Sequence, residues 1–526
     1  MARSVRNVFS NLGADFPASV VVFLVALPLC LGIALGSNAP LFSGLIAGIA
    51  GGIVIGILSG SNLSVSGPAA GLTAIVAAAI GKLPAFEAFL LAVVLAGIFQ
   101  VILGFLKAGI LGDYIPGAVI KAMLAAIGLI LILKQLPHLV GYNADFEGDE
   151  SFRQPDGSNT FTGIFKALNY ILPLAIAIGL ISLGIQIVWD NILAKKAKFF
   201  KLIPAPLIVV LVAIGINQWA MIYSPSLALP AHALVSIPVA ESLEGFLSFF
   251  MFPDFSYITN YQVWISAATI AIVASLETLL NIEASDELDP YQRVTPTNRE
   301  LKAQGAGNLV SGLLGGLPVT SVIVRTSANV HSGAKSKMSA IMHGIMLLLT
   351  VALIPKILNL IPLPALAAVL IYTGFKLAKP AIFKEFYRKG FDQFIPFVVT
   401  IVAILFTDLL VGIMIGCLVG LFFVMRSNFR SAVFVVNDEN NYLFRLRKDV
   451  SYLNKPIIKR KLAQVPENAY VLIDATRADF LDRDVVEVIE DFIISAPLKN
   501  IKVELKKSAY KEQGFSNIEG LLKASA

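Results

Sequence analysis

Charge is what this 526-residue sequence has least of. Only 14% of its residues are Asp, Glu, Lys or Arg, while 56% are hydrophobic. Soluble domains carry about 25% charged residues. This composition excludes a soluble globular protein and predicts an integral membrane protein with many spans in the lipid bilayer. The net charge of +6 is no sign of a nucleic-acid partner, because the basic residues of the apolar part lie in short loops.

Cysteine and histidine are also scarce. The two cysteines, Cys30 and Cys417, lie in apolar runs without a CxxC motif, and the four histidines lack the spacing of metal ligands. These shortages argue against a disulfide framework and a zinc site. No nucleophile triad or redox motif is present, so we predict no cofactor, no metal and no enzymatic activity. The acidic run at residues 283–289 is interpreted as a solvated turn.

Long apolar runs fill the first four fifths of the chain. A membrane-spanning helix needs about 20 apolar residues. Fourteen candidate spans lie near residues 17–36, 41–58, 64–80, 86–107, 116–134, 164–189, 203–223, 261–282, 301–314, 319–331, 337–355, 362–376, 391–407 and 408–426. The candidates at 64–80, 301–314 and 319–331 are short, as expected for half-helices.

Loop charges indicate how these spans are oriented. Lys and Arg collect in the loops after even-numbered spans, as with Lys195, Lys335 and Lys379, whereas residues 224–260 contain neither. The positive-inside rule then places both termini in the cytoplasm, in a cell inner or plasma membrane. Breaks at the third and tenth of fourteen spans divide them into seven plus seven, which predicts an inverted repeat.

The charge missing from the spans is concentrated near the C-terminus. Residues 427–526 contain sixteen Lys or Arg and fourteen Asp or Glu. Short strands are expected at 433–436, 442–446, 469–473 and 501–505, and helices at 455–462 and 485–494. This β-β-α-β-α-β order predicts a small α/β domain. We therefore predict an all-α polytopic membrane domain over residues 1–430 and a small α/β domain over residues 431–526.

Two stretches interrupt the third and tenth spans. Residues Ser64–Gly71 read SVSGPAAG, and residues Gly315–Ser321 read GGLPVTS. Gly and Pro end a helix there, and the helix that starts afterwards presents unpaired backbone N–H groups that attract anions. Arg325 follows the second break in apolar surroundings. Two broken helices and a buried cation predict an anion-binding site inside the membrane.

Glu277 is the second ionisable residue that stands in the middle of a span. Such residues are rare and usually mark a partner or a transport pathway. If spans eight and ten meet, Glu277 can pair with Arg325 and moderate its hold on an anion. A purely structural ion pair is the alternative. The hydroxyl residues of the breaks also have two interpretations, because they can donate to an oxyanion or cap the half-helices.

The segment Asn298–Lys335, which includes the second break, resembles the most recognisable segment of the SulP family of inorganic anion transporters. Ser64–Gly71 resembles the family's third-span motif, and the resemblance covers nearly the whole chain. It implies a core and a gate that move past each other like an elevator. It also implies a C-terminal STAS domain that helps form a homodimer.

The resemblance places the anion between the N-terminal ends of spans three and ten. The predicted substrate-binding residues are Ser64, Ser66, Gly67, Thr320, Ser321, Val324 and Arg325. Glu277 and Asn281 are the predicted coupling or ion-pair residues. Sodium-coupled members carry a hydroxyl one turn after the acid and no arginine in span ten, so Asn281 and Arg325 argue against sodium as the coupling ion. Proton coupling through Glu277 is a hypothesis.

The sequence therefore predicts a secondary-active transporter of small oxyanions, sulfate or bicarbonate. Three alternatives remain open. The first is a nucleobase symporter of the same fold, and the second is an anion channel with an arginine-lined site. The third is a membrane-anchored scaffold whose function resides in the C-terminal domain.

Overall fold

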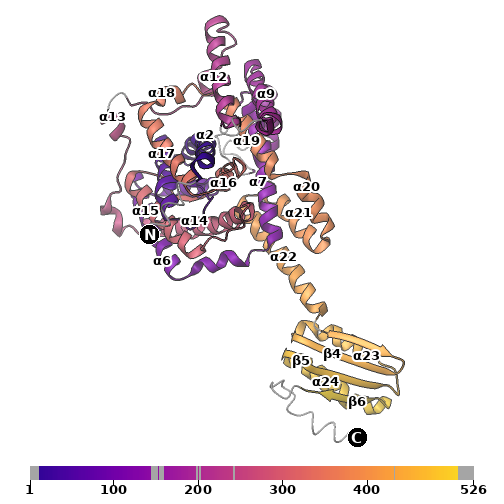
Figure 1. Ribbon diagram of the computed structural model, residues 1–526. Helices are drawn as coiled ribbons and strands as arrows, with labels where there is room; N and C mark the ends of the chain where they lie inside the picture. The colour runs from indigo at the N-terminus through magenta and orange to yellow at the C-terminus, as the bar shows by residue number, and fades with distance from the viewer. Residues whose placement is uncertain are drawn as a thin grey trace. The chain divides into compact units, whose positions relative to one another are not determined.

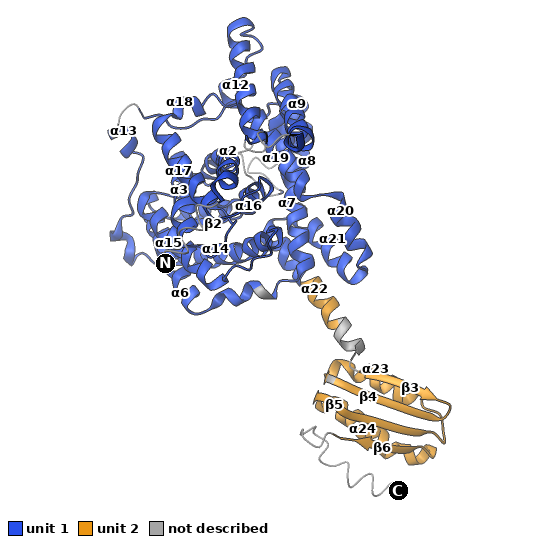
Figure 2. Cartoon of the chain, in the orientation of Figure 1, with its two compact units in different colours: residues 1–417 blue, residues 418–526 orange. Residues whose placement is uncertain are grey.

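The computed structural model describes residues 11–143, 152, 159–196, 200, 203–240, 243–431 and 433–507. The chain forms two compact units, residues 1–417 and residues 418–526, which Figure 2 draws in different colours. The division falls inside the long helix α22 (Leu409–Ser431). Unit 1 is mostly helical, whereas unit 2 contains a four-stranded sheet.

Unit 1 is a bundle of helices, most of them joined by short connections, with a longer one at residues 224–260 (Figure 1). Its longer helices are α2 (Leu12–Gly36), α3 (Leu41–Ala50), α5 (Thr73–Lys82), α6 (Phe86–Phe105), α7 (Gly117–Leu139), α9 (Pro173–Val188), α12 (Ala205–Tyr223), α14 (Tyr261–Leu288), α15 (Thr297–Leu314), α17 (Met338–Leu353), α19 (Leu363–Leu377) and α21 (Phe391–Phe406). Shorter pieces are α4 (Gly56–Leu58), α8 (Thr160–Ala167), α10 (Ala194–Lys196), α13 (Leu243–Leu247), α16 (Ile323–His331), α18 (Pro355–Leu358) and α20 (Pro380–Arg388). Two π-helical segments are η2 (Gly51–Ile55) and η5 (Trp189–Leu193), and 3₁₀ segments are η3 (Ala70–Leu72), η4 (Ala108–Tyr114), η6 (Ala231–Ala233) and η7 (Phe255–Thr259).

The apolar helices match most of the predicted spans. Among the described residues, eight helices are long and apolar enough to cross a membrane, and four more are apolar but shorter. These twelve correspond to twelve of the fourteen predicted spans, and α15 and α16 occupy the other two. The half-helix predicted at 301–314 is wrong, because α15 starts at Thr297 and runs for 18 residues.

The sixth predicted span, 164–189, begins later than expected. Helix α8 ends at Ala167, and a new helix, α9, begins at Pro173. Proline lacks a backbone N–H and is favoured in the first turn of a helix, and it pushes the residue before it into an extended conformation. Leu172 has that conformation, with φ −95° and ψ 114°.

Two hydrophobic groups of helices hold the largest buried clusters described in unit 1, and smaller clusters lie beside them. One buried cluster is centred on α6, with contributions from α3, α14 and α15, and a second is centred on α7 with α9, α12, α19 and α21. In Figure 1, α6, α14 and α15 lie together, and α20 and α21 lie beside α7. Side chains of α2, α14 and α16 also join the second cluster. Helices α2 and α14 contribute to both clusters, so they lie where the two groups meet.

Unit 2 has the predicted order of elements. Its strands are β3 (Val433–Asp438), β4 (Asn441–Val450), β5 (Tyr470–Leu481) and β6 (Lys502–Lys506), and its helices are α23 (Lys455–Ala463) and α24 (Arg483–Ser495), with short 3₁₀ turns η8 (Tyr452–Asn454) and η9 (Ala496–Lys499). The sheet order is β3-β4-β5-β6, antiparallel for the first pair and parallel for the others.

One strand of unit 2 is longer than predicted. The expected strand 469–473 continues to Leu481, because β4 also extends and pairs with it up to the Val450–Leu481 position. Two register shifts interrupt this pairing. Such irregularities break the alternation of apolar and polar residues, so the extension has no clear sequence signal.

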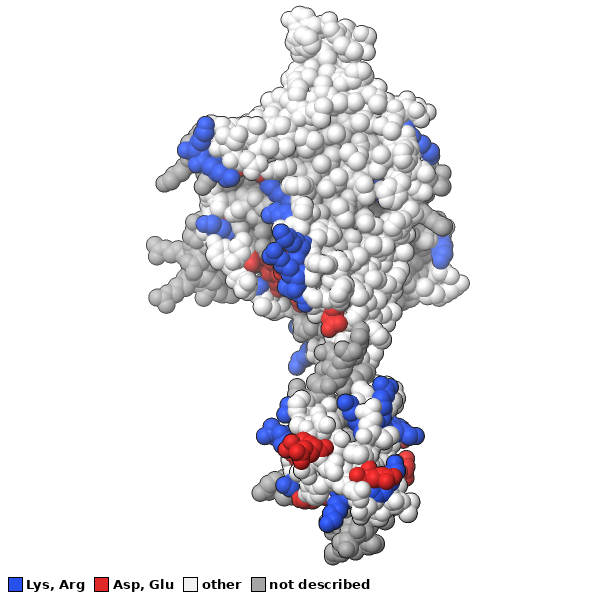
Figure 3. All heavy atoms as spheres, turned by 90° about the vertical axis from the view of Figure 1, so that its right-hand side faces the viewer, with Lys and Arg blue, Asp and Glu red and all other residues white. Residues whose placement is uncertain are grey.

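The surface of the two units differs in charge. On the face shown in Figure 3, most of unit 1 carries no charged side chains, whereas Lys, Arg, Asp and Glu of unit 2 are spread over its surface. Unit 1 also exposes many large apolar side chains, among them Leu180, Leu211 and Val402. An uncharged apolar surface is what a bilayer requires of a spanning protein.

Candidate functional site

The two predicted breaks meet as a small antiparallel sheet. Strand β1 (Ser66–Pro68) pairs with β2 (Val319–Ser321), so that Ser66 lies opposite Ser321 and Gly67 opposite Thr320. The N–H of Val322 donates to the carbonyl of Val65 at 2.9 Å and continues the ladder. Extended strands were not predicted here. The pairing satisfies backbone groups that the broken helices would otherwise leave unbonded inside an apolar protein.

Helix α15 supports the outer edge of this pair. The amide of Asn308 accepts from the N–H of Val319 at 2.6 Å and donates to its carbonyl at 2.9 Å, as a neighbouring strand would. Its side chain also donates to Gln100 at 2.6 Å. Asn308 is completely buried. Asn308 thus gives Val319 the two hydrogen bonds that a neighbouring strand would otherwise supply.

The strand pair also needs close approach by a neighbouring helix. A Cβ atom at Gly51, in the π-helical segment η2, would lie 2.3 Å from the carbonyl oxygen of Ser66. Real Cβ atoms essentially never come this close to backbone. Glycine at position 51 therefore lets η2 pack directly on β1. Segments of π-helix are rare and often occur at functional sites.

The predicted hydroxyl residues are buried and bonded within the protein. Ser64 and Ser321 share a hydrogen bond of 2.7 Å between their hydroxyl oxygens. Ser66 accepts from the Gln304 amide at 2.8 Å, and Thr320 donates to the carbonyl of Ser321 at 3.1 Å. In this conformation the Ser64–Ser321 bond joins the two breaks, and the bond of Ser66 ties the first break to α15.

Arg325 lies just after β2, in the first turn of α16. Its side chain is completely buried, and its guanidinium packs on β1, because a Cβ at Gly67 would lie 1.9 Å from one terminal nitrogen. None of its three nitrogens has an oxygen or nitrogen partner among the described residues. The thiol of Cys30 lies beside it, and His343 is also within electrostatic range. A buried charge without a partner costs about 3–5 kcal/mol. An anion bound beside this guanidinium would recover that cost.

Glu277 and Asn281 come from α14 and also lie beside the breaks. The Glu277 carboxylate lies about 3.1 Å from the position of a Cβ at Gly71, whereas Arg325 packs at Gly67. No hydrogen bond joins the carboxylate to Arg325 in the described part of the chain, and their ion pair stays a prediction. Asn281 donates to the carbonyl of Ser321 at 2.6 Å. Asn281 therefore holds β2 in place.

A small cavity adjoins this site. It has a volume of about 20 Å³ and is lined by Val322, Val324 and Arg325 of the second break, together with Ala70, Lys134, Gln135 and apolar residues of α2 and α7. A single water molecule needs about 10–15 Å³ on this measure. The cavity therefore holds little more than one water in this conformation. An oxyanion can enter only if its walls separate.

Lys134, Gln135 and His343 were missed by the sequence reasoning. Lys134 is a cation inside an apolar run, which is the signal that identified Glu277 and Arg325. It lay at the predicted end of span five, 116–134, where a lysine is ordinary. Helix α7 continues to Leu139, so Lys134 is in fact within the helix and buried.

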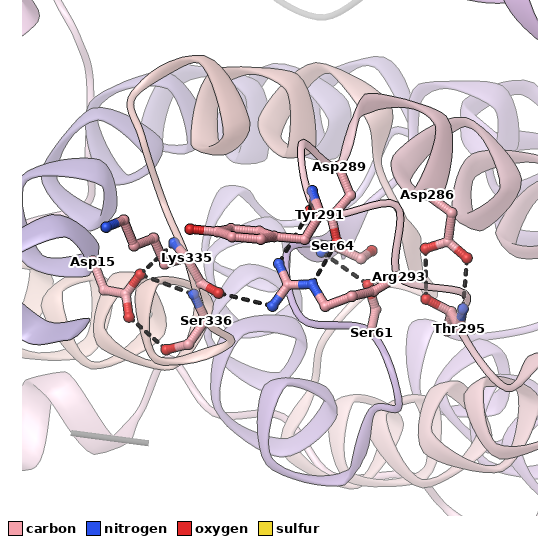
Figure 4. A network of polar contacts seen from close by, with 10 residues as sticks. All are labelled: Asp15, Ser61, Ser64, Asp286, Asp289, Tyr291, Arg293, Thr295, Lys335 and Ser336. Atoms are coloured by element: carbon pink, nitrogen blue, oxygen red, sulfur yellow. Dashed lines mark hydrogen bonds and ion pairs between the residues drawn. The ribbon is translucent and has the colours of Figure 1, made fainter. Parts of the chain in front are cut away.

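The acidic run after span eight is no solvated turn. Helix α14 continues to Leu288, and Asp286 accepts from the N–H and hydroxyl of Thr295 at 2.6 and 2.7 Å (Figure 4). Asp289 accepts two hydrogen bonds from Arg293, which also donates to the carbonyl of Lys335. Burial raises the pKa of the Asp289 carboxyl, but its hydrogen bonds with Arg293 and the backbone outweigh this and hold the pKa below its ordinary value. These contacts fix the α14–α15 connection beside the breaks.

Asp15 makes a similar connection from α2. Its carboxylate accepts from the N–H groups of Lys335 and Ser336 at 2.7 and 3.0 Å, and from the hydroxyl of Ser336 (Figure 4). Asp15 is completely buried. It therefore anchors the start of α2 to the connection between α16 and α17.

Replacing Asp15 with alanine should destabilise unit 1 by about 2–3 kcal/mol, because two backbone N–H groups lose their acceptor. The measurement is the thermal unfolding midpoint of the purified protein in detergent. The matched control is Asp392→Ala, since Asp392 is an exposed acid in the first turn of α21. Equal midpoints for both variants would contradict the anchoring role.

Comparison with known proteins gives a consistent result. Residues 12–403 match the model of the sulfate permease family. The chain is 27% identical over 438 residues to YvdB of Bacillus subtilis strain 168, named as a candidate sulfate transporter, and the match covers 83% of this chain and 78% of YvdB. It is 26% identical over 426 residues to the bicarbonate transporter BicA of Picosynechococcus sp., covering 78% of this chain and 70% of BicA.

A solved structure supports the fold. The overall structure of SLC26A9 aligns with a TM-score of 0.66 and 17% sequence identity, over 98% of this chain and 87% of that chain. At this identity the likeness concerns the fold alone. It agrees with the prediction of a helical membrane transporter with a small C-terminal sheet region.

Proposed function

The chain belongs to the sulfate permease family, a family of membrane anion transporters and not of enzymes, and we propose that it is a secondary-active transporter of small inorganic oxyanions. The proposed substrate is sulfate, bicarbonate or both. YvdB and BicA, whose names refer to these two anions, have similar identity to this chain. They therefore support the class of substrate without ranking its members.

One observation carries this proposal. A completely buried guanidinium lies where two broken helices meet, and the described residues offer its nitrogens no oxygen or nitrogen partner. Arg325 can give an oxyanion charge-assisted hydrogen bonds in this dry setting. Helix α16 adds the partial positive charge of its N-terminus next to the same side chain.

The predicted substrate-binding residues divide into two proposed roles. Arg325 and Val324 line the cavity and would face the anion. Ser64 and Ser321 bond each other across the breaks, and Gly67 leaves room for the guanidinium. Ser66 and Thr320 are bonded to Gln304 and to the carbonyl of Ser321. Contact with the anion requires these hydroxyls to exchange their present bonds when the cavity opens.

We place these residues in a fourteen-span, seven-plus-seven inverted repeat. Antiparallel pairing of β1 and β2 supports this arrangement, because the two breaks run in opposite directions. The two hydrophobic groups of helices support a core that moves against a gate, as an elevator does. Both groups contribute to the cavity wall, the first through Ile33 and the second through Ile130 and Val324.

The remaining assignments concern unit 2 and the membrane. We assign unit 2 as a STAS-like domain that takes part in a homodimer, supported by its β-β-α-β-α-β order. Lysines of the even-numbered loops support a cytoplasmic position for both termini. The coupling ion is proposed to be a proton acting through Glu277, since position 281, one turn after this acid, carries asparagine in place of a hydroxyl residue, and Arg325 already places a positive charge beside the breaks.

Uptake of labelled anion into proteoliposomes tests the proposal. We expect accumulation of sulfate, bicarbonate or both, driven by an imposed proton gradient and unaffected by a sodium gradient of equal size. Absence of uptake for both anions would contradict the transport function. Uptake that ignores the proton gradient would contradict coupling through Glu277 alone, and electrical currents far above carrier rates would favour a channel.

A further inference from the structure

A second, larger pocket lies in unit 1. Its volume is about 420 Å³, within the range of small-molecule sites, and it is bounded by α2, η5, α12, α16 and α19. Polar side chains in its wall include Gln186, Asp190, His331, Tyr372 and Lys376. None of these residues belongs to the predicted site. The pocket is therefore a separate place where polar groups converge.

The pocket lies next to the Arg325 cavity along two shared helices. On α16, Ala328 lines the pocket three residues after Arg325, a rise of about 4.5 Å. On α2, Val21 lines the pocket and Leu29 lines the cavity, about 12 Å apart. Val25 is buried between them. A thin apolar layer thus separates the pocket from the proposed substrate site.

Several hydrogen-bond donors in this wall suit an anion. Gln186 is 2% exposed, and its amide nitrogen has no partner among the described residues. Lys376 contributes a full positive charge, and its ammonium lies 4.5 Å from the centre of the Tyr372 ring. A buried, unbonded donor costs free energy, which an acceptor in the pocket would recover.

Lys376 already forms an ion pair with Asp190. Its carboxylate oxygen lies 2.6 Å from the ammonium of Lys376, and both side chains are only partly exposed, at 34% and 24%. Asp190 belongs to the π-helical segment η5, one turn after Gln186. The π-helical segment η5 therefore places the Asp190 carboxylate on the pocket wall, in the position beside Lys376 that an entering oxyanion would take.

We propose that this pocket is a second anion site, on the side of the membrane where the basic loops lie, and that Asp190 is its built-in competitor. An inorganic oxyanion displaces Asp190 from Lys376 and waits beside the closed apolar layer. The inference deepens the proposed transport function and rests on it for the passage of the anion inward. Occupation of the pocket itself does not require transport.

Trp189 offers a direct readout, because its indole lines this pocket. The chain has three tryptophans, so the full-length double variant Trp219→Phe and Trp264→Phe leaves Trp189 as the only one. Titrating this protein with sulfate or bicarbonate in detergent should give a saturable change in its fluorescence. Asp190→Asn should lower the midpoint by about two- to fivefold, the range of a partly exposed ion pair, and Lys376→Gln should raise it.

The controls separate this site from the proposed substrate site. Glu385→Gln removes an ion pair of 2.7 Å with Lys389 on an exposed helix and should leave the midpoint unchanged. Arg325→Ala should abolish uptake but keep the Trp189 signal. The inference is overturned if Asp190→Asn does not lower the midpoint, if it lowers it equally in the Lys376→Gln protein, or if Arg325→Ala removes the signal. Loss of uptake in the parent protein with the signal intact contradicts only the transport function.

Discussion

Arg325→Ala is expected to abolish anion binding while leaving the protein folded. The guanidinium is the buried cation at the crossing of the two breaks, with no oxygen or nitrogen partner among the described residues. Charge-assisted hydrogen bonds are worth about 1.5–3 kcal/mol each, so losing two of them weakens binding by about a hundredfold or more. Uptake of sulfate and bicarbonate into proteoliposomes measures the effect.

Thermal unfolding distinguishes loss of the site from loss of the fold. Removing a buried charge that lacks a partner relieves a desolvation cost, which offsets the space left by the side chain. The variant without anion should therefore unfold close to the parent temperature, while stabilisation by added anion disappears. Arg388→Ala, at an exposed position in α20, is the matched control and should keep both properties. Unchanged uptake in Arg325→Ala would remove Arg325 from the site.

Gly51→Ala is expected to be almost as damaging, although it adds a single methyl group. The new Cβ would lie 2.3 Å from the carbonyl oxygen and 2.5 Å from the carbonyl carbon of Ser66. These are backbone atoms of β1, so relief requires the strand pair to move. Overpacking in a dense interior costs about 1–3 kcal/mol. Because β1 positions Gly67 against Arg325, we also expect uptake to fall by at least about tenfold.

A second glycine in the same region provides the control. Gly81 lies in α5, and a Cβ there would have no neighbour within 4 Å. Gly81→Ala should keep full uptake and raise stability slightly, because alanine is favoured over glycine in a helix by about 1 kcal/mol. If Gly51→Ala and Gly81→Ala have the same uptake and the same unfolding temperature, the close packing of η2 on β1 is not required for transport. Unfolding temperature and uptake together give the comparison.

The breaks show how far local sequence reaches. Gly and Pro in Ser64–Gly71 and Gly315–Ser321 indicated where the helices stop, and short helices do begin just after both. The strands between them gave no signal, because three residues are too few for a periodic pattern. Strand pairing brings residues 66 and 321 together across 255 positions of sequence. Only the folded chain contains that contact.

The ionisable residues show a similar division. Glu277 and Arg325 stand out in the sequence because a charge inside an apolar run is costly, so it usually has a partner or a function. Lys134 escaped because the end of its span was placed five residues too early. The acidic residues 286 and 289 were misjudged for the same reason, since α14 continues past the point where apolar residues stop. Helix ends with polar residues are buried here by neighbouring segments that local composition cannot reveal.

The amino-acid sequence alone assigns the class of protein. Scarce charge, long apolar runs and the concentration of charge after residue 427 follow from solvation alone, and a bilayer selects for them directly. It also determined where the spans break and which cation follows. The tertiary structure decided what those breaks do: they pair as strands, bury Arg325 against Gly67 and leave a cavity beside Val324. Those outcomes depend on how closely segments far apart in the sequence approach each other. That approach is set by the packing of the folded chain and cannot be read from the spacing of residues along the sequence.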